Sequence, residues 1–427
     1  MLDLKLIRDD PDRVRAALAR RGDAQVAAGL DAVLELDGQR RELIPQVEGL
    51  RAERNAAAAA IAQAKRTGED AAEAIAAQRE VGAREKQLNG ELAEVEERLR
   101  SALAPLPNLP DPTAASGPDD ELVKIVGEPR LGGGELAEGE RAPGVRDHLE
   151  LAGAMIDMDR AAQLSGARFA YLKGDLVMLE LALVRFALEK LRGHGFEPVI
   201  PPVLVRERAL YGTGFLPDTE QQIYRLADDD LYLVGTSEVA LASLHDEEIV
   251  PAERLPLRYA GFSPCFRREA GAAGKDTRGI FRVHQFDKVE MFSFVEPDTS
   301  TEEHERILAI EEEILTELQL PYRVVNIAVN DLGNSAAKKY DCEAWLPSQG
   351  RYRELTSCSN TTDYQARRLN IRVRRDKRTE TLHTLNGTAV AVGRTIIALL
   401  ENGQREDGTV ALPEVLSAYG APAVLGA

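Results

Sequence analysis

The feature that most constrains this chain is a long, helix-favouring segment from about Leu30 to Leu103. It is rich in Ala, Glu, Arg and Gln, which have high helix propensity, and its only proline is Pro45, a candidate kink. Apolar residues recur in steps of three, four and seven, the spacing of a coiled coil. They are Leu36, Leu43, Val47 and Leu50, followed by Leu88, Leu92, Val95, Leu99 and Leu103. The pattern predicts two long helices.

The break between these helices is expected at Arg66–Asp70. Gly68 can take the left-handed conformation of a helix end there, and the acidic pair after it can begin the next helix. The result is an antiparallel coiled-coil hairpin whose limbs extend about 50 Å, more than a helix needs to cover a local core. We favour an arm that reaches a distant partner, and a coiled coil that dimerises the chain is the alternative.

Composition narrows the class of protein. No apolar run approaches membrane-spanning length and the N-terminus is charged throughout, so we expect a cytoplasmic protein. The three cysteines, Cys265, Cys342 and Cys358, are too few and too scattered for a disulfide framework or a structural zinc site. The net charge of -18 argues against binding to nucleic acid, but it is a sum over the whole molecule, whereas binding depends on local basic patches. The basic stretch Ala366–Arg378 could contact RNA locally or form a strand with one solvated face.

The domain organisation follows from the proline-rich linker at residues 105–118, which neither a helix nor a central strand tolerates. It separates a domain at residues 1–104, with its arm at about 30–103, from a second domain at 119–427. In the second, strand-like runs such as Leu257–Phe262 and Phe281–Phe294 have hairpin-length connections, while Leu176–Leu191 and Thr301–Leu318 are helical in pattern. This predicts an α+β fold, an antiparallel sheet flanked by helices, rather than a dinucleotide-binding domain.

The densest group of chemically capable residues lies between Phe262 and Glu290, where two strand-like stretches flank a loop rich in Gly and Ala. Strand alternation would place five side chains on one face, namely Arg282, His284, Phe286, Lys288 and Glu290. Guanidinium groups suit phosphates, a ring suits a base, and a carboxylate suits an ammonium group. The pattern favours a site for a nucleotide and an amine. A solvated strand with salt bridges is the alternative, and it leaves Phe286 unexplained.

These stretches, FRRE at Phe266–Glu269 and FRVHQFDKVE at Phe281–Glu290, resemble motif 2 of the class II aminoacyl-tRNA synthetases in its seryl form. Further segments resemble the family's serine-binding loop, its nucleotide and metal segment, its motif 3, and its motif 1 with the sequel at the dimer interface. In that order they are Gly235–Leu241, Tyr340–Pro347 with Tyr352–Arg368, Leu385–Arg394, and Gly195–Leu204 with Tyr211–Pro217. With the arm, the resemblance to bacterial-type seryl-tRNA synthetases covers nearly the whole chain.

The resemblance implies a homodimeric ligase that activates L-serine with ATP and Mg²⁺, releases pyrophosphate, and transfers the serine to tRNA(Ser). It leaves tRNA(Sec) open as a second acceptor and implies no membrane partner. The implied catalytic residues are Arg267, Glu354 and Arg394. The implied serine-binding residues are Thr236, Ser237, Glu238, Arg267, Glu290, Asn386 and Thr388.

The implied ATP site has distinct parts. Arg267 would bind the α-phosphate, Glu269 the adenine amine, and Arg282 the γ-phosphate, while Phe286 and Arg394 would sandwich the adenine ring. The full implied set is Arg267, Arg268, Glu269, Arg282, Val283, Phe286, Glu354, Leu355, Thr356, Ser357 and Arg394, with Glu354 and Ser357 as Mg²⁺ ligands. The implied tRNA contacts are Lys65 and Arg66 at the arm tip and Lys275 and Arg278 in the motif 2 loop.

Other functions remain as alternatives. A carrier-protein ligase of synthetase type would share the pocket, but such relatives lack the arm, so Leu30–Leu103 discriminates against it. A catalytically inactive relative or a purely coiled-coil interaction protein would not need the charged residues of the hairpin. Position 268 is Arg where the family commonly has a small Ser, and its place beside Arg267 should turn it away from the substrate face.

Overall fold

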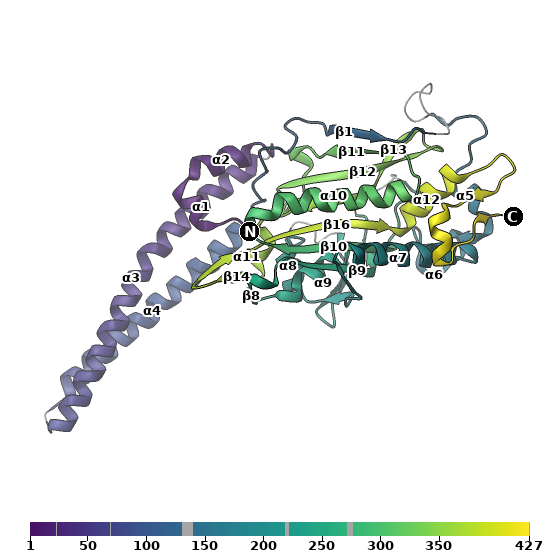
Figure 1. The fold of residues 1–427 in the computed structure, drawn as a ribbon. Helices are drawn as coiled ribbons and strands as arrows, with labels where there is room; N and C mark the ends of the chain where they lie inside the picture. The colour runs from purple at the N-terminus through teal and green to yellow at the C-terminus, as the bar shows by residue number, and fades with distance from the viewer. Residues whose placement is uncertain (23, 69, 130–139, 218–221, 271–275, 427) are drawn as a thin grey trace. The chain divides into compact units, whose positions relative to one another are not determined.

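The computed structural model describes residues 1–22, 24–68, 70–129, 140–217, 222–270 and 276–426. The chain divides into two compact units, residues 2–107 and residues 108–427, the latter together with Met1. Figure 1 shows an N-terminal unit built of helices alone and a larger unit built around a sheet.

The N-terminal unit begins with two short helices, α1 (Leu4–Asp9) and α2 (Pro11–Ala19), which are capped by Asp3 and Asp10. Two long helices follow, α3 (Ala24–Thr67) and α4 (Ala72–Leu103), and α3 continues through Pro45. Gly68 has a φ of 79°, the left-handed conformation predicted for the helix end. The predicted coiled-coil hairpin is confirmed.

The two limbs hold each other along one seam. Buried side chains on α3 and α4 form it, and they include Leu36, Val47, Ile61, Val95 and Leu99. Ion pairs cross the seam in antiparallel register, with Arg40 at 3.1 Å from Glu96 and Arg54 at 2.7 Å from Glu85. The basic partners in these two pairs are partly exposed, so we attribute most of the cohesion to the apolar seam.

The larger unit is built on an eight-stranded sheet in the order β1-β11-β12-β13-β16-β10-β9-β4. Neighbouring strands are antiparallel except β4, which runs parallel to β9. The strands are β1 (Glu121–Val126), β4 (Glu197–Val199), β9 (Leu257–Phe266), β10 (Gln285–Val295), β11 (Tyr322–Asn326), β12 (Lys338–Leu346), β13 (Arg351–Asn360) and β16 (His383–Ala391). The predicted α+β class with an antiparallel sheet is confirmed.

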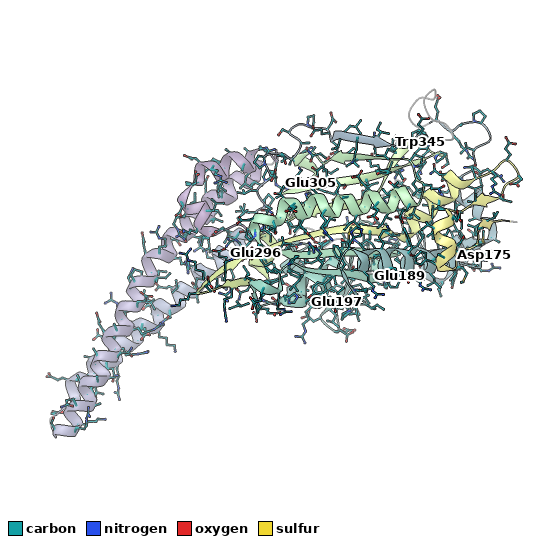
Figure 2. All side chains as sticks on the ribbon, viewed as in Figure 1. Asp175, Glu189, Glu197, Glu296, Glu305 and Trp345 are labelled. Carbon is teal, nitrogen blue, oxygen red and sulfur yellow. The ribbon has the colours of Figure 1, made fainter. Side chains whose placement is uncertain are left out.

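Three helices pack on this sheet, α7 (Asp175–Gly193), α10 (Ser300–Glu317) and α12 (Val392–Gly403). Their apolar faces join one core, in which Leu183, Ile307 and Ile396 are fully buried. Charged residues such as Glu189 and Glu305 lie on their exposed faces (Figure 2). At Gly387 on β16 an added Cβ would lie 2.3 Å from Ile307 Cγ2, so a side chain there would push α10 away from the sheet.

Smaller elements surround the sheet. The short helices are α5 (His148–Ala152), α6 (Met158–Ser165), α8 (Glu207–Thr213), α9 (Glu238–Ala242) and α11 (Tyr364–Arg368). Minor sheets are formed by β2 (Ile156–Asp157) with β3 (Tyr171–Leu172), by β5 (Leu204–Val205), β7 (Leu231–Leu233) and β6 (Arg225–Leu226), by β8 (Ile249–Pro251), β14 (Arg372–Arg375) and β15 (Arg378–Thr381), and by β17 (Val410–Ala411) with β18 (Val424–Leu425).

The structure corrects two predicted boundaries. The strand expected from Phe281 begins only at Gln285, because the amides before it are bonded elsewhere: Ile280 N–H donates to His148 Nε2 and His284 N–H to Arg168 O. Continuous alternation from Arg282 onward is therefore wrong. The basic stretch Ala366–Arg378 likewise spans parts of three elements, the end of α11, all of β14 and the start of β15.

Candidate active site

A pocket lies where β9 ends and β10 begins, against β13 and the junction of β16 with α12. Residues from five segments line it: Arg267, Glu269, Ile280, Phe281, Arg282, Val283, Phe286, Lys288, Glu354, Leu355, Thr388, Ala391, Gly393 and Arg394. The strand pairing sets this geometry, because Phe286 lies opposite Cys265 and Glu290 opposite Gly261. Residues that are far apart in the sequence therefore meet at one end of the sheet.

Arg267 occupies the centre of this arrangement. It follows β9 directly, and its backbone N–H donates to His284 O at 3.0 Å. Its Nε donates to Gly235 O at 3.1 Å, and its guanidinium carbon lies 5.2 Å from the centroid of the Phe286 ring. These contacts hold the guanidinium between the aromatic part of the pocket and the loop that precedes α9.

At one end of the pocket, arginines are arranged around an aromatic ring. The guanidinium carbons of Arg353 and Arg394 lie 3.9 and 4.6 Å from the centroid of Phe281. Arg282 Nη1 donates to Glu269 at 2.7 Å. Such a set can bind a polyanion with a flat ring, because guanidinium groups both stack and pair with phosphates.

Glu354 faces this cationic end from β13. Its carboxylate lies 3.3 Å from Arg394 Nη1, which also donates to the Glu354 carbonyl at 3.0 Å. Burial alone would raise the pKa of Glu354, but the charges of Arg394, Lys339 and Arg267 outweigh it and lower the pKa below its usual range. Glu354 is thus an anion held among cations, where it could bind a divalent cation and where phosphates would compete with it for the arginines.

Next to Lys288 and Thr388, which line the pocket, lies a polar cluster whose other members do not line it, namely Thr236, Glu238, Glu290 and Asn386. Lys288 Nζ donates to Thr236 Oγ1 at 2.8 Å and forms a short ion pair with Glu290. Thr388 Oγ1 donates to Glu290 at 3.5 Å. Burial raises the pKa of Glu290, and Lys288 opposes this rise. Glu290 therefore already has a cationic partner.

The second carboxylate of this cluster, Glu238 at the start of α9, has only neutral donors. Gln365 Nε2 and Asn386 Nδ2 both donate to its Oε1, at 2.7 and 3.0 Å. Burial, followed by repulsion from Glu290, raises the pKa of Glu238 to about 7. Across the described ranges, no donor bonds to Glu238 Oε2. This oxygen can take a cationic ligand.

Some of the predicted site residues lie outside the pocket. Thr356 is buried and donates to Glu311 Oε2 at 2.9 Å, while Ser237 is buried and donates to Gly261 O at 3.4 Å. Ser357 does not line the pocket either and lies opposite Asp341 of β12 in the sheet. Arg268 does not line the pocket. His284 does not line the pocket either. Its Nδ1 lies 2.9 Å from Arg267 O, and its ring centroid lies 5.3 Å from that of Phe169.

Three further residues of the site have no role assigned from the sequence, namely Lys288, Arg353 and Gln365. Strand alternation places Lys288 on the same face as Glu290. A lysine two residues from a carboxylate on one face of a strand is a signal for the buried ion pair that these residues form. Arg353 lies beside Glu354, and its side chain reaches Asp276 at 2.7 Å and Phe281. No local pattern in the sequence points to Gln365, because only the tertiary fold brings its side chain on α11 to Glu238 on α9.

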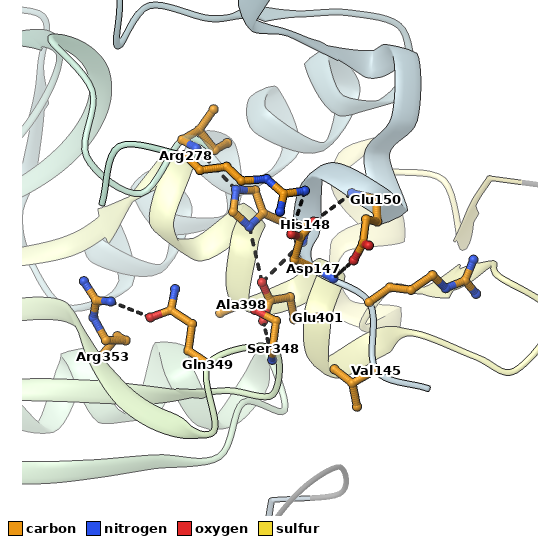
Figure 3. A network of polar contacts seen from close by, with 12 residues as sticks. Val145, Asp147, His148, Glu150, Arg278, Ser348, Gln349, Arg353, Ala398 and Glu401 are labelled. Carbon is orange, nitrogen blue, oxygen red and sulfur yellow. Dashed lines mark hydrogen bonds and ion pairs between the residues drawn. The ribbon is translucent and has the colours of Figure 1, made fainter. Parts of the chain in front are cut away.

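The residues just before β10 are held in place by His148 at the start of α5 (Figure 3). Ile280 N–H donates to His148 Nε2 at 3.3 Å, and His148 Nδ1 lies 3.2 Å from Glu401 Oε1. Gly279 is required here, because an added Cβ would lie 2.1 Å from His148 Nε2. The predicted tRNA contact Arg278 is exposed beside this anchor and pairs with Asp147 at 3.1 Å.

Of the other predicted tRNA contacts, Lys275 lies outside the described residues. Lys65 and Arg66 are exposed in the last turn of α3. In the basic stretch, Arg368 is buried and donates to Tyr211 O and Leu216 O, whereas Arg374 and Arg375 are exposed on β14 with Val373 buried between β8 and β15. Its second half is thus a strand with one solvated face, and Arg375 pairs with Glu296.

The described part of the chain contains no helix that is long and apolar enough to cross a membrane. It also contains no group of three or more His, Cys, Asp or Glu side chains arranged to hold a metal ion.

Comparison with known families matches both units. Residues 1–110 match the seryl-tRNA synthetase N-terminal domain, and residues 222–403 match the tRNA synthetase class II core domain (G, H, P, S and T). A relative named serine–tRNA ligase, from Streptomyces coelicolor, is 49 % identical over 421 residues, covering 98 % of this chain and 97 % of its own.

Two solved structures also match along the entire length. One is a seryl-tRNA synthetase from Pyrococcus horikoshii complexed with ATP, with a TM-score of 0.91 and 44 % identity, covering 100 % of this chain and 99 % of that one. The other is a cytoplasmic serine-tRNA ligase from Naegleria fowleri in complex with AMP, with a TM-score of 0.85 and 32 % identity, covering 100 % and 98 %. The resemblance predicted from the motifs is confirmed.

Proposed function

This chain belongs to the seryl-tRNA synthetase family, and we propose from that premise that its pocket forms seryl-adenylate and passes the serine to tRNA. It is a serine–tRNA ligase, as are the relatives that match nearly its full length. One observation supports the site assignment above all. Arg267 lies between a cationic, aromatic end suited to ATP and a buried carboxylate end suited to an amino acid.

The reaction joins a carboxylate oxygen of serine to the α-phosphorus of ATP and releases pyrophosphate. We assign Arg267 to both reacting groups, so that it holds nucleophile and electrophile together and offsets the charge that builds up on the α-phosphate. No protein base is required, because the attacking carboxylate is already ionised at neutral pH. The pocket has to position and neutralise rather than remove a proton.

For ATP, we assign the adenine ring to the space between Phe286 and Arg394, with the adenine amine on Glu269. Arg282, which bonds to Glu269 at 2.7 Å, would turn to the γ-phosphate of a bent nucleotide. Stacking favours Arg394 over a lysine, since a planar guanidinium can lie flat on a base. The relative solved with ATP supports this use of the pocket.

Mg²⁺ fits the donor chemistry beside the phosphates. Glu354 offers a carboxylate and Ser357 a hydroxyl, both of them hard oxygen ligands, and Mg²⁺ commonly takes one or two protein ligands with phosphates and water as the rest. When bound, the cation neutralises phosphate charge. The contribution of the chain itself is to keep Glu354 ionised through Arg394, Lys339 and Arg267.

The charges around Glu238 and Glu290 indicate which part of serine each carboxylate would bind. Glu290 is already paired with Lys288, so we assign it, with Thr388, to the serine hydroxyl. Glu238 has only neutral donors, so we assign its Oε2 to the serine ammonium, with Thr236 beside it. Alanine would leave Glu290 and Thr388 without their hydroxyl partner, which can cost a factor of about 10⁴ in such pockets.

We extend the proposal to a homodimer that works in the cytoplasm. The exposed side of α7 and the segment after β4 carry apolar side chains, with Met178, Leu181 and Ile200 exposed by 46, 55 and 84 %. Exposed apolar surface of this kind marks a protein interface, and the motif 1 resemblance falls on the same segment. A second copy of this chain is the occupant we assign to it.

For tRNA, we assign the arm to the body of tRNA(Ser), with Lys65 and Arg66 as its phosphate contacts, and Arg278 to the acceptor end. Arg278 suits this role because its side chain is 67 % exposed and its pair with Asp147 is open to solvent. Whether tRNA(Sec) is also charged depends on tRNA shape, which charging assays with both tRNAs would measure directly.

ATP–pyrophosphate exchange across the amino acids tests the proposed function. We expect exchange with serine, exchange lower by about 10³-fold or more with alanine, and no dependence on tRNA. Exchange driven by a different amino acid would show that the carboxylate end is assigned wrongly. Absence of exchange with every amino acid, by a folded protein with ATP and Mg²⁺, would refute the adenylate-forming role of the pocket.

The dependence on pH follows from Glu238. Its pKa of about 7 means that it is largely protonated below pH 7 and ionised above it. Since an ammonium needs the ionised form, kcat/KM for serine in the exchange assay should rise roughly ten-fold per pH unit below this pKa and level off above it. A flat profile between about pH 6 and about pH 8 would contradict the assignment.

A further inference from the structure

Gln365 lies outside the pocket lining and has no role in the reaction as described so far. It is on α11, is completely buried, and donates through Nε2 to Glu238 Oε1 at 2.7 Å and to Thr213 O at 3.2 Å. Its Oε1 accepts from Thr384 Oγ1 at 2.9 Å and from Thr361 Oγ1 at 3.3 Å. Both N–H groups and the oxygen of the amide therefore have partners.

These partners determine which way the amide points. A backbone carbonyl only accepts hydrogen bonds, so the atom facing Thr213 O has to be the nitrogen. The same nitrogen then faces Glu238, and the oxygen faces the two threonine hydroxyls. Thr213, Thr361 and Thr384 are fully buried and come from three different segments, namely α8, the residues after β13, and β16, so the orientation is fixed by the tertiary fold.

We propose that Gln365 is a positioning residue for serine recognition, which holds the Glu238 carboxylate by Oε1 so that Oε2 is presented to the serine ammonium. The proposal rests on the proposed function. Asn386 donates to the same Oε1 at 3.0 Å, but it is only half-buried and is itself a predicted serine contact. Gln365 is the donor to Glu238 that has no direct part in binding the substrate.

The donated hydrogen bond has an electrostatic effect as well. The charged groups that face Glu238 are Glu290 and Lys288 on β10 and Arg267 after β9. Glu290 disfavours the ionised form of Glu238, and the two cations favour it, as does the N–H of Gln365. Loss of that N–H should therefore move the ionisation of Glu238 to higher pH.

The test compares Gln365→Met with the wild-type chain in serine-dependent ATP–pyrophosphate exchange between about pH 6 and about pH 8.5. We expect KM for serine at pH 7 to rise about ten-fold, since Asn386 still holds Oε1, with KM for ATP changed less than about two-fold. The midpoint of the pH profile of kcat/KM for serine should move to higher pH. An unmoved midpoint, or an equal rise in both KM values, would overturn the proposal.

Two further variants separate positioning from general destabilisation. Thr384→Val removes one donor to Gln365 Oε1 with little change in shape, and should shift the midpoint the same way by a smaller amount. If Gln365→Met does not fold, Thr384→Val tests the proposal in its place, and an unmoved midpoint in Thr384→Val would overturn it. Asn326→Leu removes a buried amide on β11 that donates to Thr113 O and Glu121, and should leave the midpoint unmoved. A shift in this control would also overturn it.

Glu238→Gln distinguishes failure of this inference from failure of the proposed function. If it raises KM for serine and abolishes the pH dependence while Gln365→Met changes neither, then Glu238 binds serine and Gln365 does not position it. If Glu238→Gln leaves KM for serine unchanged, the assignment of Glu238 to the ammonium is wrong, and the inference about Gln365 falls with it.

Discussion

Replacing Arg267 with alanine is expected to reduce serine-dependent ATP–pyrophosphate exchange by about 10³-fold or more. The reason is that one guanidinium, held between Gly235 O and the Phe286 ring, is assigned to both reacting groups. Most of the loss should fall on kcat, because charge on the α-phosphate is greatest in the transition state. Initial rates at saturating ATP and serine measure it.

Two comparisons make this result interpretable. Arg267→Lys keeps the charge but loses the planar fork, so its activity should lie between those of the wild-type chain and the alanine variant. Arg254→Ala removes an exposed arginine that pairs with Glu248 at 3.1 Å, and should change the rate less than about two-fold. If Arg267→Ala fell no further than Arg254→Ala, the central role of Arg267 would be excluded.

Shortening the arm is expected to abolish tRNA charging while leaving adenylate formation largely intact. The cross-limb pairs Arg54–Glu85 and Arg40–Glu96 define a register in which residues 55–81 form the distal part of the hairpin. Replacing that part with a short Gly- and Ser-rich turn removes it without shifting the remaining seam. Aminoacylation should fall by about 10²-fold or more, because the contacts of the arm with tRNA are lost.

The same preparation supplies its own control, since exchange needs no tRNA and should stay within about two-fold of the wild-type rate. A milder variant, Lys65→Ala with Arg66→Ala, should weaken charging most at low salt and make it less dependent on salt if these residues contact phosphates. Full charging by the shortened chain would eliminate the arm as the tRNA-binding element and leave the dimerising coiled coil as its alternative role.

Much of this fold could be predicted because its signals are local. The 3-4 spacing around Leu36 and Leu99 fixes a coiled coil, and a glycine between two helical runs fixes the turn, so the arm needed no tertiary information. Hairpin-length connections likewise predicted an antiparallel sheet. Alternation along β10 correctly brought Phe286 and Lys288 to the pocket, because strand geometry repeats every two residues.

What could not be predicted depends on contacts between distant segments. The late start of β10 follows from His148, whose ring accepts the Ile280 N–H more than a hundred residues along the chain. Thr356 points away from the pocket because its hydroxyl donates to Glu311 on α10, which packs on the sheet. Gln365 meets Glu238 only because α11 packs where α8 and α9 also meet. No short-range pattern encodes such encounters.

The seam of the arm has a consequence for how the arm meets an RNA. Between Arg51 and Ala60 nearly every side chain is exposed, and beyond Val47 the next buried apolar residue of α3 is Ile61. Local opening should therefore become easier from Val47 towards the tip, since opening free energy follows buried contact. The distal turns would then exchange between helical and frayed conformers. Part of the free energy of RNA binding would be spent on ordering them, so affinity and helicity at the tip would be thermodynamically coupled.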